Sequence, residues 1–513
     1  MYLTPEPYFK SMRVLLTNPP CRFPLGEGGL ERYVVRGGIR WPFSIIKERE
    51  RKLPAMLPFY QAYSAALLEK EGIEVKVIDA IPLNLEYDEF YRLVKKRSPD
   101  LAVVECSTIS IDNDLKVAEK IKEETGAKIM LAGLHVSALP NEIMNSAPWI
   151  DYIAIGEYEY TILESAQRLE KGKDNMEGVK GLAWREGGGR NKIKINPRRE
   201  LIEPLDKLPY PARHLFPLDN APDMDVYFDE WCQRRPALQQ HASRGCPYGC
   251  NFCAWTQVIY ASRKYRTFSP GYVVGEMQHL IQRWNAKEIY FDDDDFTIDK
   301  MHVLEICKLI RENGIEIPWS CMGDVISVDE ELIREMANAG CFGLKFGVES
   351  GDEALIRANG KPVSLAKVKQ VAKWCRKYKL RTHATFTFGL LGESKESVKK
   401  TINFALSLDV DSVQFSITTP FPGTKFYEEA KPYIIAQRWE EFDGCHRAVV
   451  SYPQLSAKEI ERAFKEASLA YKRKKLLNPR WLFGKVKLHY KTGGIKALCN
   501  GMIKATKLFV GME

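Results

Sequence analysis

Three cysteines could hold a metal centre: Cys246, Cys250 and Cys253, at CxxxCxxC spacing in a loop that contains glycine and proline. Soft thiolates suit iron–sulfur clusters or zinc. A structural zinc site nearly always takes four protein ligands, and no second cysteine pair follows this segment. A [4Fe–4S] cluster commonly takes four cysteines, so three would leave one iron open to bind another molecule. We therefore predict a [4Fe–4S] cluster with one open iron. The alternative is a zinc knuckle or a chance group of cysteines.

The same segment resembles the signature of the radical S-adenosylmethionine (SAM) superfamily, in which an aromatic residue, here Phe252, precedes the third cysteine. The resemblance implies that the open iron chelates the amino and carboxylate groups of SAM. It also implies that one electron from the cluster breaks the sulfonium C–S bond and yields a 5′-deoxyadenosyl radical. This step needs a strongly reducing cluster, and clusters reach such potentials. A low-potential electron donor is therefore an expected partner.

Further motifs of this resemblance follow later apolar runs: acids at 292–294, a Glu-Ser pair and a Gly-x-x-Gly turn. The resemblance implies that the acids face SAM, that the pair contacts its ribose or methionine part, and that the turn approaches adenine. Leu391 stands in that turn where proline is usual. A solvated acidic turn and a strand-end glutamate with a structural partner are the alternatives. The residues implied to contact SAM are Phe252, Asp292, Asp293, Glu349, Ser350, Gly389 and Gly392.

The elements that would position these residues form two series. In the first, apolar runs at 14–17, 74–79, 101–106, 128–132 and 152–155 alternate with helical patterns. Short β-rich runs joined by helices indicate right-handed crossovers and a parallel sheet covered on both faces. We predict a flavodoxin-like, doubly wound α/β domain at 1–170. Ligands of such domains bind at the carboxyl ends of the strands, near the switch point.

The second series has strand candidates at 238–242, 288–291, 319–321, 343–347, 382–388 and 412–417. Six βα units are fewer than a closed barrel needs, so we predict a partial (β/α)6 barrel at 236–430. Its active site would lie at the C-terminal strand ends, by analogy with complete barrels. A three-glycine turn at 187–189 and the prolines after it predict a hairpin and linker at 171–235. We also predict a helical, basic region at 431–513.

A flavodoxin-like domain before a radical SAM core resembles the cobalamin-dependent branch of the superfamily. The resemblance implies that cobalamin binds to loops after the first, third and fourth strands and to the residue that ends the second. The Asp-x-His-x-x-Gly motif that supplies a lower cobalt ligand in methionine synthase-like proteins is absent. His135 lies in one of these loops but is not expected to ligate cobalt. The residues implied to bind cobalamin are Asn18, Pro19, Asp79, Ser107, Thr108, Gly133 and Ser137.

The segment RGGIRWPF at 36–43 lies in a long insertion, which is either functional or a surface flap. It resembles branch members that act on hopanoid lipids and tetrapyrrole rings, as does CNFCAWTQ at 250–257. The resemblance implies C-methylation of an unactivated carbon in a lipid- or isoprenoid-like hydrophobic substrate, with methyl-cobalamin recharged by a second SAM. The alternatives are ring contraction, cyclisation or C–C coupling without methyl transfer, and a non-catalytic membrane-associated scaffold. The sequence assigns no catalytic acid or base.

The net charge of +8 is concentrated in the tail, where residues 471–513 carry eleven lysines and arginines against one acid. Apolar residues between lysines at 495–509 predict an amphipathic helix in peripheral contact with a membrane. A helix packed on the barrel is the alternative. The chain lacks an apolar run of about 18 residues and a signal peptide, so we expect a cytoplasmic protein, with peripheral contact on the inner membrane face through the tail. We expect no nucleic-acid partner, because no RNA-reading module is present.

Overall fold

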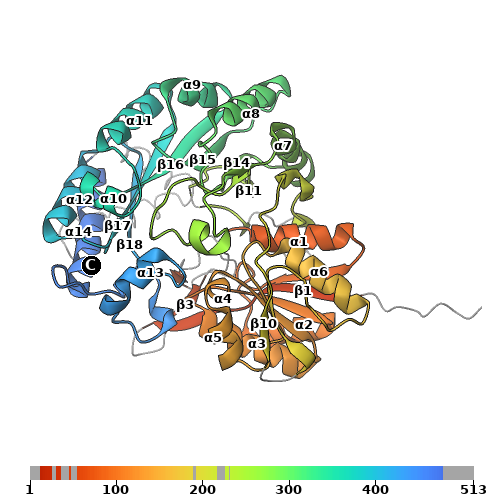
Figure 1. The fold of residues 1–513 in the computed structure, drawn as a ribbon. Coiled ribbons are helices and arrows are strands. Elements are labelled where there is room, and N and C mark those ends of the chain that lie inside the picture. The colour runs from red at the N-terminus through yellow and green to blue at the C-terminus, as the bar shows by residue number, and fades with distance from the viewer. Residues whose placement is uncertain are drawn as a thin grey trace, which may run out of the picture.

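The computed structural model describes residues 12–25, 31–35, 45–47, 55–188, 192–216, 226–229 and 231–477. Within these residues the chain forms two lobes, each built on a large sheet (Figure 1). The N-terminal lobe, red to yellow, holds a seven-stranded sheet, and the second lobe, green to blue, holds a six-stranded sheet. A small antiparallel sheet of β2 (Arg22–Leu25), β3 (Glu31–Val35) and β4 (Ile45–Lys47) belongs to the long insertion.

The sheet of the N-terminal lobe has a flavodoxin-like centre. Five parallel strands follow the order β5-β1-β6-β7-β8, the doubly wound arrangement with its switch point beside β1. They are nearly continuous apolar runs because both faces are covered. The antiparallel hairpin of β9 (Leu182–Arg185) and β10 (Ile193–Ile195) extends the sheet beyond β8. The five parallel strands are β1 (Arg13–Asn18), β5 (Glu74–Asp79), β6 (Leu101–Cys106), β7 (Lys128–Gly133) and β8 (Tyr152–Ala154).

Helices cover the two faces of this sheet in pairs. On one face α1 packs against α6, and on the other α2 packs against α3. Their bounds are α1 (Phe59–Lys70), α2 (Tyr87–Arg97), α3 (Ile111–Thr125) and α6 (Glu159–Glu170). The short helices α4 (Leu134–Ala138) and α5 (Pro140–Ser146) follow β7 directly. The predicted doubly wound domain is confirmed.

The second lobe is the predicted partial barrel. Its strands pair in sequence order and in parallel, so each βα unit lies beside the next. The strands are β11 (Ala237–Gln240), β14 (Glu288–Phe291), β15 (Trp319–Gly323), β16 (Cys341–Glu349), β17 (Arg381–Phe388) and β18 (Ser412–Ile417). The helices are α7 (Pro270–Trp284), α8 (Lys300–Glu312), α9 (Glu330–Asn338), α10 (Glu353–Ala358), α11 (Leu365–Lys377) and α12 (Lys395–Ser407). Several begin at an aspartate or serine whose side chain caps the first turn, as at Asp299 and Ser269.

The C-terminal segment returns to both lobes. After α13 (Lys425–Ala430) and η6 (Lys431–Tyr433), the short 3₁₀-helix η7 (Trp439–Glu441) contacts α3, and the helix α14 (Ala457–Leu476) packs on α12 and β18. The predicted amphipathic helix at 495–509 and the RGGIRWPF segment lie outside the described residues. In the part of the chain that the structure describes, every helix is too short or too polar to cross a membrane.

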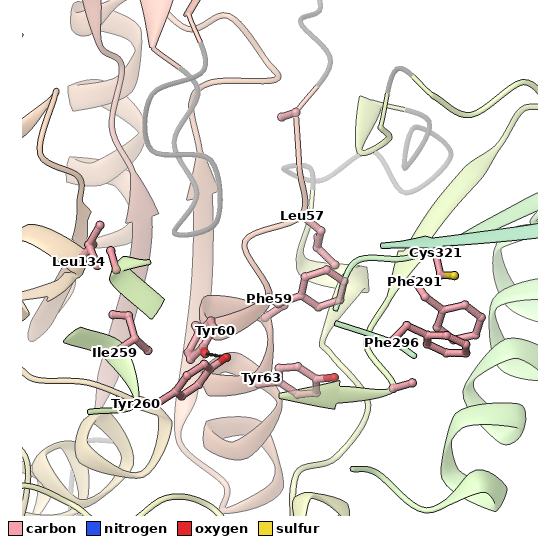
Figure 2. Packing of buried hydrophobic residues seen from close by; sticks show 14 of the residues in the cluster. Leu57, Phe59, Tyr60, Tyr63, Leu134, Ile259, Tyr260, Phe291, Phe296 and Cys321 are labelled. Carbon is pink, nitrogen blue, oxygen red and sulfur yellow. Dashed lines mark hydrogen bonds between the residues drawn. The ribbon is translucent and has the colours of Figure 1, made fainter. Parts of the chain in front are cut away.

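A shared apolar core joins the lobes along α1. The side chains of Phe59, Tyr60 and Tyr63 on this helix lie among residues of the second lobe, including Tyr260 and Ile259 (Figure 2). All five are at most 5% exposed. The two lobes therefore share one apolar core.

Candidate functional site

The cysteine triad lies on one loop that a small hairpin holds in place. The loop leaves β12 (Ser243–Arg244) and returns through β13 (Arg266–Thr267), which pairs antiparallel with it. Cys246, Cys250 and Cys253 are partly exposed and free. Gly245 has a φ of +93°, and a side chain there would collide with the carbonyl oxygen of Lys264. Only glycine allows this close approach of the two strands, so the loop geometry is fixed at its first cysteine.

The donor set fits a cluster with an open iron. Burial raises the pKa of all three thiols. Within the described ranges no three His, Cys, Asp or Glu side chains converge on one ion position. A cuboidal cluster binds each cysteine through a different iron, so its sulfurs stand apart. Three thiolates without a fourth cysteine in the loop fit a [4Fe–4S] cluster with one open iron, whereas a structural zinc site nearly always takes four protein ligands.

The acids after β14 have different tasks. Asp292 lines a cavity and hydrogen-bonds to Gln239. Asp293 accepts hydrogen bonds from the Ala242 N–H (2.9 Å) and the Ser243 hydroxyl (2.6 Å), so its Oδ1 holds the start of the cysteine loop against β14. Both are fully buried. The structure therefore places Asp292 at the cavity, whereas Asp293 has the contacts of a structural residue.

Asp294 ties the same strand end to the cluster loop. Its Oδ2 accepts the Gly245 N–H and the Tyr260 hydroxyl, each at 2.8 Å. Phe252, between the second and third cysteines, is partly exposed. The acidic run thus reaches the backbone beside the first cysteine.

The Glu-Ser pair at the end of β16 has its two side chains in different environments. Glu349 forms an ion pair with Lys361 at 2.6 Å, and its φ of +71° is rare for a residue with a side chain. Ser350 is fully buried, and its hydroxyl hydrogen-bonds to the Thr401 hydroxyl on α12 at 2.9 Å. Only Glu349 of the two keeps partial exposure.

The glycine turn after β17 needs its glycines. Gly389 and Gly392 have φ values of +95° and +81°. The Gly389 N–H donates to Glu393, and its carbonyl accepts the Tyr452 hydroxyl at 3.0 Å. Burial raises the pKa of Glu393 to about 8. Hydrogen bonds to both the N–H and the carbonyl of Gly389 therefore fix the backbone of this turn.

The predicted cobalamin residues meet at one edge of the N-terminal sheet, at the ends of β1 and β5. Asn18 and Pro19 are buried there, and the Asn18 carbonyl accepts the Ala80 N–H at 2.9 Å. Asp79 accepts the Tyr227 hydroxyl at 2.8 Å. Burial raises the pKa of Asp79 to about 7, with hydrogen bonds from Tyr227 and Asn18 opposing that rise.

The loops after β6 and β7 complete this edge. Gly133 has a φ of +116°, and a side chain there would collide with the Cys106 carbonyl oxygen. Ser137 accepts the Gly156 N–H at 3.1 Å, so it supports the loop after β8. Thr108 contacts His135 (Oγ1 to Nδ1, 3.3 Å), while Ser107 contacts the Ser110 hydroxyl at 2.8 Å.

His135 is buried and uncharged. Burial lowers its pKa to about 3, and its ring meets the Trp439 ring edge-on at 4.8 Å. Two buried polar atoms at this edge, Asn18 Oδ1 and His135 Nε2, have no hydrogen-bond partner among the described residues. Such atoms, together with the glycine cradle at Gly133, fit a surface that a polar cofactor covers. The residues present therefore fit cobalamin.

A small, partly open cavity lies between the two lobes. It is walled by the start of α1 on one side, and by the cysteine loop and the ends of β11 and β14 on the other. Trp255 enters it from η5 (Trp255–Ile259), a single π-helical turn directly after the third cysteine, and such turns are frequent at functional sites. The lining residues are Met56, Leu57, Pro58, Phe59, Tyr60, His241, Ser243, Arg244, Trp255, Tyr260, Asp292 and Asp294.

Sequence reasoning missed most of this lining. Of the residues that line the cavity, the sequence pointed only to the acids Asp292 and Asp294 as facing SAM, because the residues before α1 belong to no motif. One usable signal was the aromatic repeat itself: Phe59, Tyr60 and Tyr63 stand where a solvated helix face would be polar.

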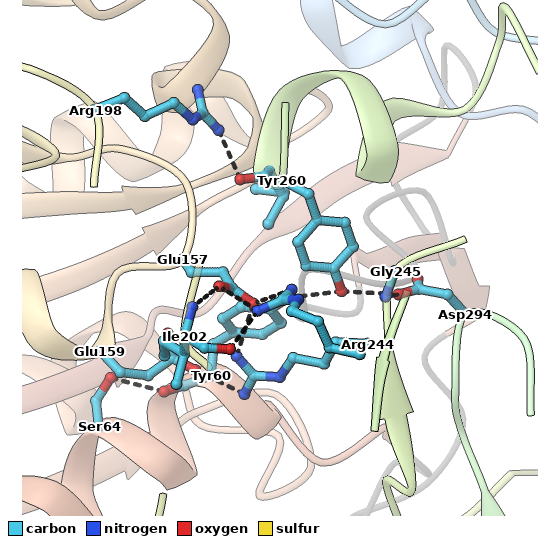
Figure 3. A network of polar contacts seen from close by, with 12 residues as sticks. Tyr60, Ser64, Glu157, Glu159, Arg198, Ile202, Arg244, Gly245, Tyr260 and Asp294 are labelled. Carbon is cyan, nitrogen blue, oxygen red and sulfur yellow. Dashed lines mark hydrogen bonds and ion pairs between the residues drawn. The ribbon is translucent and has the colours of Figure 1, made fainter. Parts of the chain in front are cut away.

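A buried ion-pair network crosses from the N-terminal lobe to the cysteine loop (Figure 3). Arg244, which precedes Gly245 in the loop, contacts Glu157 at 3.2 Å and Glu159 at 2.7 Å. Arg266 on β13 binds both oxygens of Glu157, at 2.8 and 2.9 Å. Burial opposes ionisation of Glu157, but the two arginines outweigh it and lower its pKa.

A second set of contacts runs beside this network. The Tyr60 hydroxyl on α1 hydrogen-bonds to the Tyr260 hydroxyl at 3.0 Å, and Tyr260 in turn donates to Asp294. The Arg244 guanidinium lies 4.5 Å from the centre of the Tyr60 ring, a cation–π contact. The cysteine loop is thus attached to both α1 and α6.

Two protein-family models match separate parts of this chain. The model of the radical SAM superfamily matches residues 242–405, and that of the B12-binding domain matches residues 58–165. An uncharacterised methyltransferase of Pyrococcus horikoshii is 29% identical over 90% of this chain and 93% of its own length. The anaerobic magnesium-protoporphyrin IX monomethyl ester cyclase of Cereibacter sphaeroides is 26% identical over 74% of this chain and 61% of its own.

A solved structure has the same arrangement of lobes. The cobalamin-dependent S-adenosylmethionine radical enzyme OxsB, with aqua-cobalamin and S-adenosylmethionine bound, superposes with a TM-score of 0.69. The match covers 96% of this chain and 72% of that one at 15% identity. At this identity the likeness establishes a common fold.

Proposed function

We propose that this chain, a radical SAM enzyme with an N-terminal B12-binding domain, methylates an unactivated carbon of a hydrophobic, lipid- or isoprenoid-like substrate. Its cofactors are a [4Fe–4S] cluster, SAM and cobalamin. When bound, the cluster with SAM supplies the hydrogen-abstracting radical and cobalamin supplies the methyl group. Cys246, Cys250 and Cys253 would hold the cluster, and the loops around Asn18 and Gly133 would hold cobalamin.

One observation carries the proposal: the cavity is walled by both lobes at once. Asp292, which we propose faces SAM, lines it from the radical SAM lobe, and Phe59 lines it from the B12-binding lobe. A carbon held there is accessible from both cofactor domains, which hydrogen abstraction and methyl delivery at the same atom require. No single-lobe pocket would meet that condition.

The chain's own residues prepare this cavity in three ways. Met56, Leu57 and Phe59 give it an apolar wall, which suits a hydrophobic substrate and keeps water from a reactive intermediate. The positive charge of Arg244 is balanced by Glu157 and Glu159, so the wall presents little net charge from that side. The Tyr60–Tyr260–Asp294 hydrogen bonds keep the wall aligned with the cysteine loop.

The test uses the full chain, reconstituted anaerobically with iron, sulfide and hydroxocobalamin. It is incubated with SAM labelled in its methyl group, dithionite and a total lipid extract. We expect 5′-deoxyadenosine and labelled lipid. The Cys250→Ser variant should give neither product, because one cluster ligand is missing. Absence of 5′-deoxyadenosine from fully iron-loaded protein would instead favour a non-catalytic scaffold.

Ring formation or rearrangement without methyl transfer is the second candidate, and the cyclase among the relatives favours it. Product mass separates the two reactions, because methylation adds a methylene unit and rearrangement adds nothing. 5′-Deoxyadenosine accompanied by an unlabelled product would support this candidate and reject methyl transfer.

A further inference from the structure

An ion pair between Glu349 and Lys361 lies at the end of β16, where the backbone has an unusual conformation. Glu349 adopts a φ of +71°, and the register between β16 and β17 shifts between Gly347 and Glu349. This irregular backbone turns the carboxylate back toward Lys361, whose Nζ lies 2.6 Å from Glu349 Oε1 and donates to the Gly347 carbonyl at 2.9 Å. Residues held in left-handed backbone conformations cluster at functional sites, where the surroundings enforce them.

The pair is tightly enclosed. A Cβ on Gly347 would lie 2.6 Å from Lys361 Nζ and would collide with Glu349, so glycine leaves room for the contact. The side chains of Lys361 and Glu349 are only 12% and 15% exposed. Charges so shielded from water interact strongly with other charges nearby.

The segment that carries Lys361 rests against the cysteine loop. The Asn251 N–H, next to Cys250, donates to the Asn359 carbonyl at 3.0 Å. A side chain on Gly360 would collide with the Gly249 carbonyl and reach 3.3 Å from the Cys250 amide nitrogen. Lys361 follows directly in the sequence, so its ammonium belongs to the segment that packs against the cysteine loop. The lysine is therefore a buried cation beside the second cluster ligand.

We propose that Lys361, held by Glu349, sets the reduction potential of the [4Fe–4S] cluster. Reduction adds one electron from a low-potential donor to the cluster, makes or breaks no bond, and raises the negative charge of the site. A nearby cation stabilises the reduced form, and Glu349 limits that effect by partly neutralising it. Net charge around a cluster is one of the features that tune its potential. This inference rests on the cluster and is independent of the substrate proposed above.

The test is a redox titration of the reconstituted full chain without SAM, with the reduced cluster followed by electron paramagnetic resonance. Lys361→Met should shift the midpoint potential to a more negative value, while Lys361→Arg, which keeps the charge, should restore it. Glu349→Gln should shift the potential in the opposite direction, because the cation is then uncompensated.

Lys345→Met is the matched control. Lys345 lies on β16 and forms a buried ion pair with Asp229, also at 2.6 Å, but it has no contact with the cysteine loop among those described. Its loss should leave the potential unchanged. The proposal is overturned if Lys361→Met matches the unmodified chain, or if Lys345→Met shifts the potential equally. Should Lys361→Met fail to hold a cluster, Glu349→Gln decides alone, and an unchanged or more negative potential rejects the idea.

Discussion

The buried network around Glu157 allows a quantitative test of how the lobes are joined. In Glu157→Gln the shape is kept and the negative charge is lost. Glu157 accepts two hydrogen bonds from Arg266, one from Arg244 and one from the Ile202 N–H (3.0 Å). A glutamine retains one acceptor oxygen, so Arg244 would keep Glu159 as a carboxylate partner, whereas Arg266 would lose the carboxylate that binds it through both oxygens.

The expected loss follows from this geometry. Hydrogen bonds to charged groups contribute about 1.5–3 kcal/mol each, and removing one partner of a buried ion pair typically costs about 3–5 kcal/mol. Because Glu157 is 4% exposed, solvent does little to reduce the effect. We expect the free energy of unfolding to fall by about 3–5 kcal/mol.

The measurement is urea denaturation followed by tryptophan fluorescence. Glu164→Gln is the matched control, since Glu164 binds Arg199 through the same two-oxygen geometry (2.9 and 2.7 Å), with its side chain 42% exposed. Surface pairs contribute about 0–1 kcal/mol, so the control should change little. If Glu157→Gln destabilises the chain no more than Glu164→Gln does, the network does not stabilise the junction.

Three further outcomes can be measured. Because burial raises the pKa of Asp79 to about 7, the folded chain keeps a proton that the unfolded chain loses above about pH 4. The free energy of unfolding should therefore fall by up to about 4 kcal/mol between pH 4 and pH 7, and Asp79→Asn should remove this decrease in urea titrations at several pH values; equal pH profiles would argue against it. Protein reconstituted with hydroxocobalamin should retain cobalt through desalting. His135→Ala should leave the visible spectrum of the bound cobalamin unchanged, because we do not expect the ring to ligate cobalt; a shifted spectrum would identify His135 as a ligand. Removal of the basic tail after Leu477 should abolish flotation with anionic phospholipid vesicles, and equal recovery of both forms would refute attachment through the tail.

Much of the fold could be predicted from local pattern. The strand at 288–291 matches β14 because a short apolar run bounded by polar or turn residues indicates burial. The strand at 412–417 matches β18, in which Phe415 and Ile417 are buried and alternate with less buried residues. The parallel order then followed from the alternation with helices. Because parallel strands have their carboxyl ends at the same edge of the sheet, the predicted strand ends also indicated which polar residues would lie together at that edge.

Contacts between distant residues could not be predicted in this way. Glu157 and Arg266 are 109 positions apart, and no periodicity links them. The left-handed backbone at Glu349 was equally hidden, since glycine or asparagine is the usual signal for it. The acids at 292–294 looked alike in sequence, yet Asp293 supports the cysteine loop while Asp292 lines the cavity.

The aromatic face of α1 has a consequence for engineering. A fragment that ended before the second lobe would present Phe59, Tyr60 and Tyr63 to water, and contiguous apolar surface of this kind promotes aggregation. The halves of this protein are therefore poor candidates for separate expression. A chimera that takes its N-terminal lobe from a relative would also need that relative's residues around positions 260 and 268. Otherwise the aromatic face of α1 would not pack against Tyr260 and Phe268.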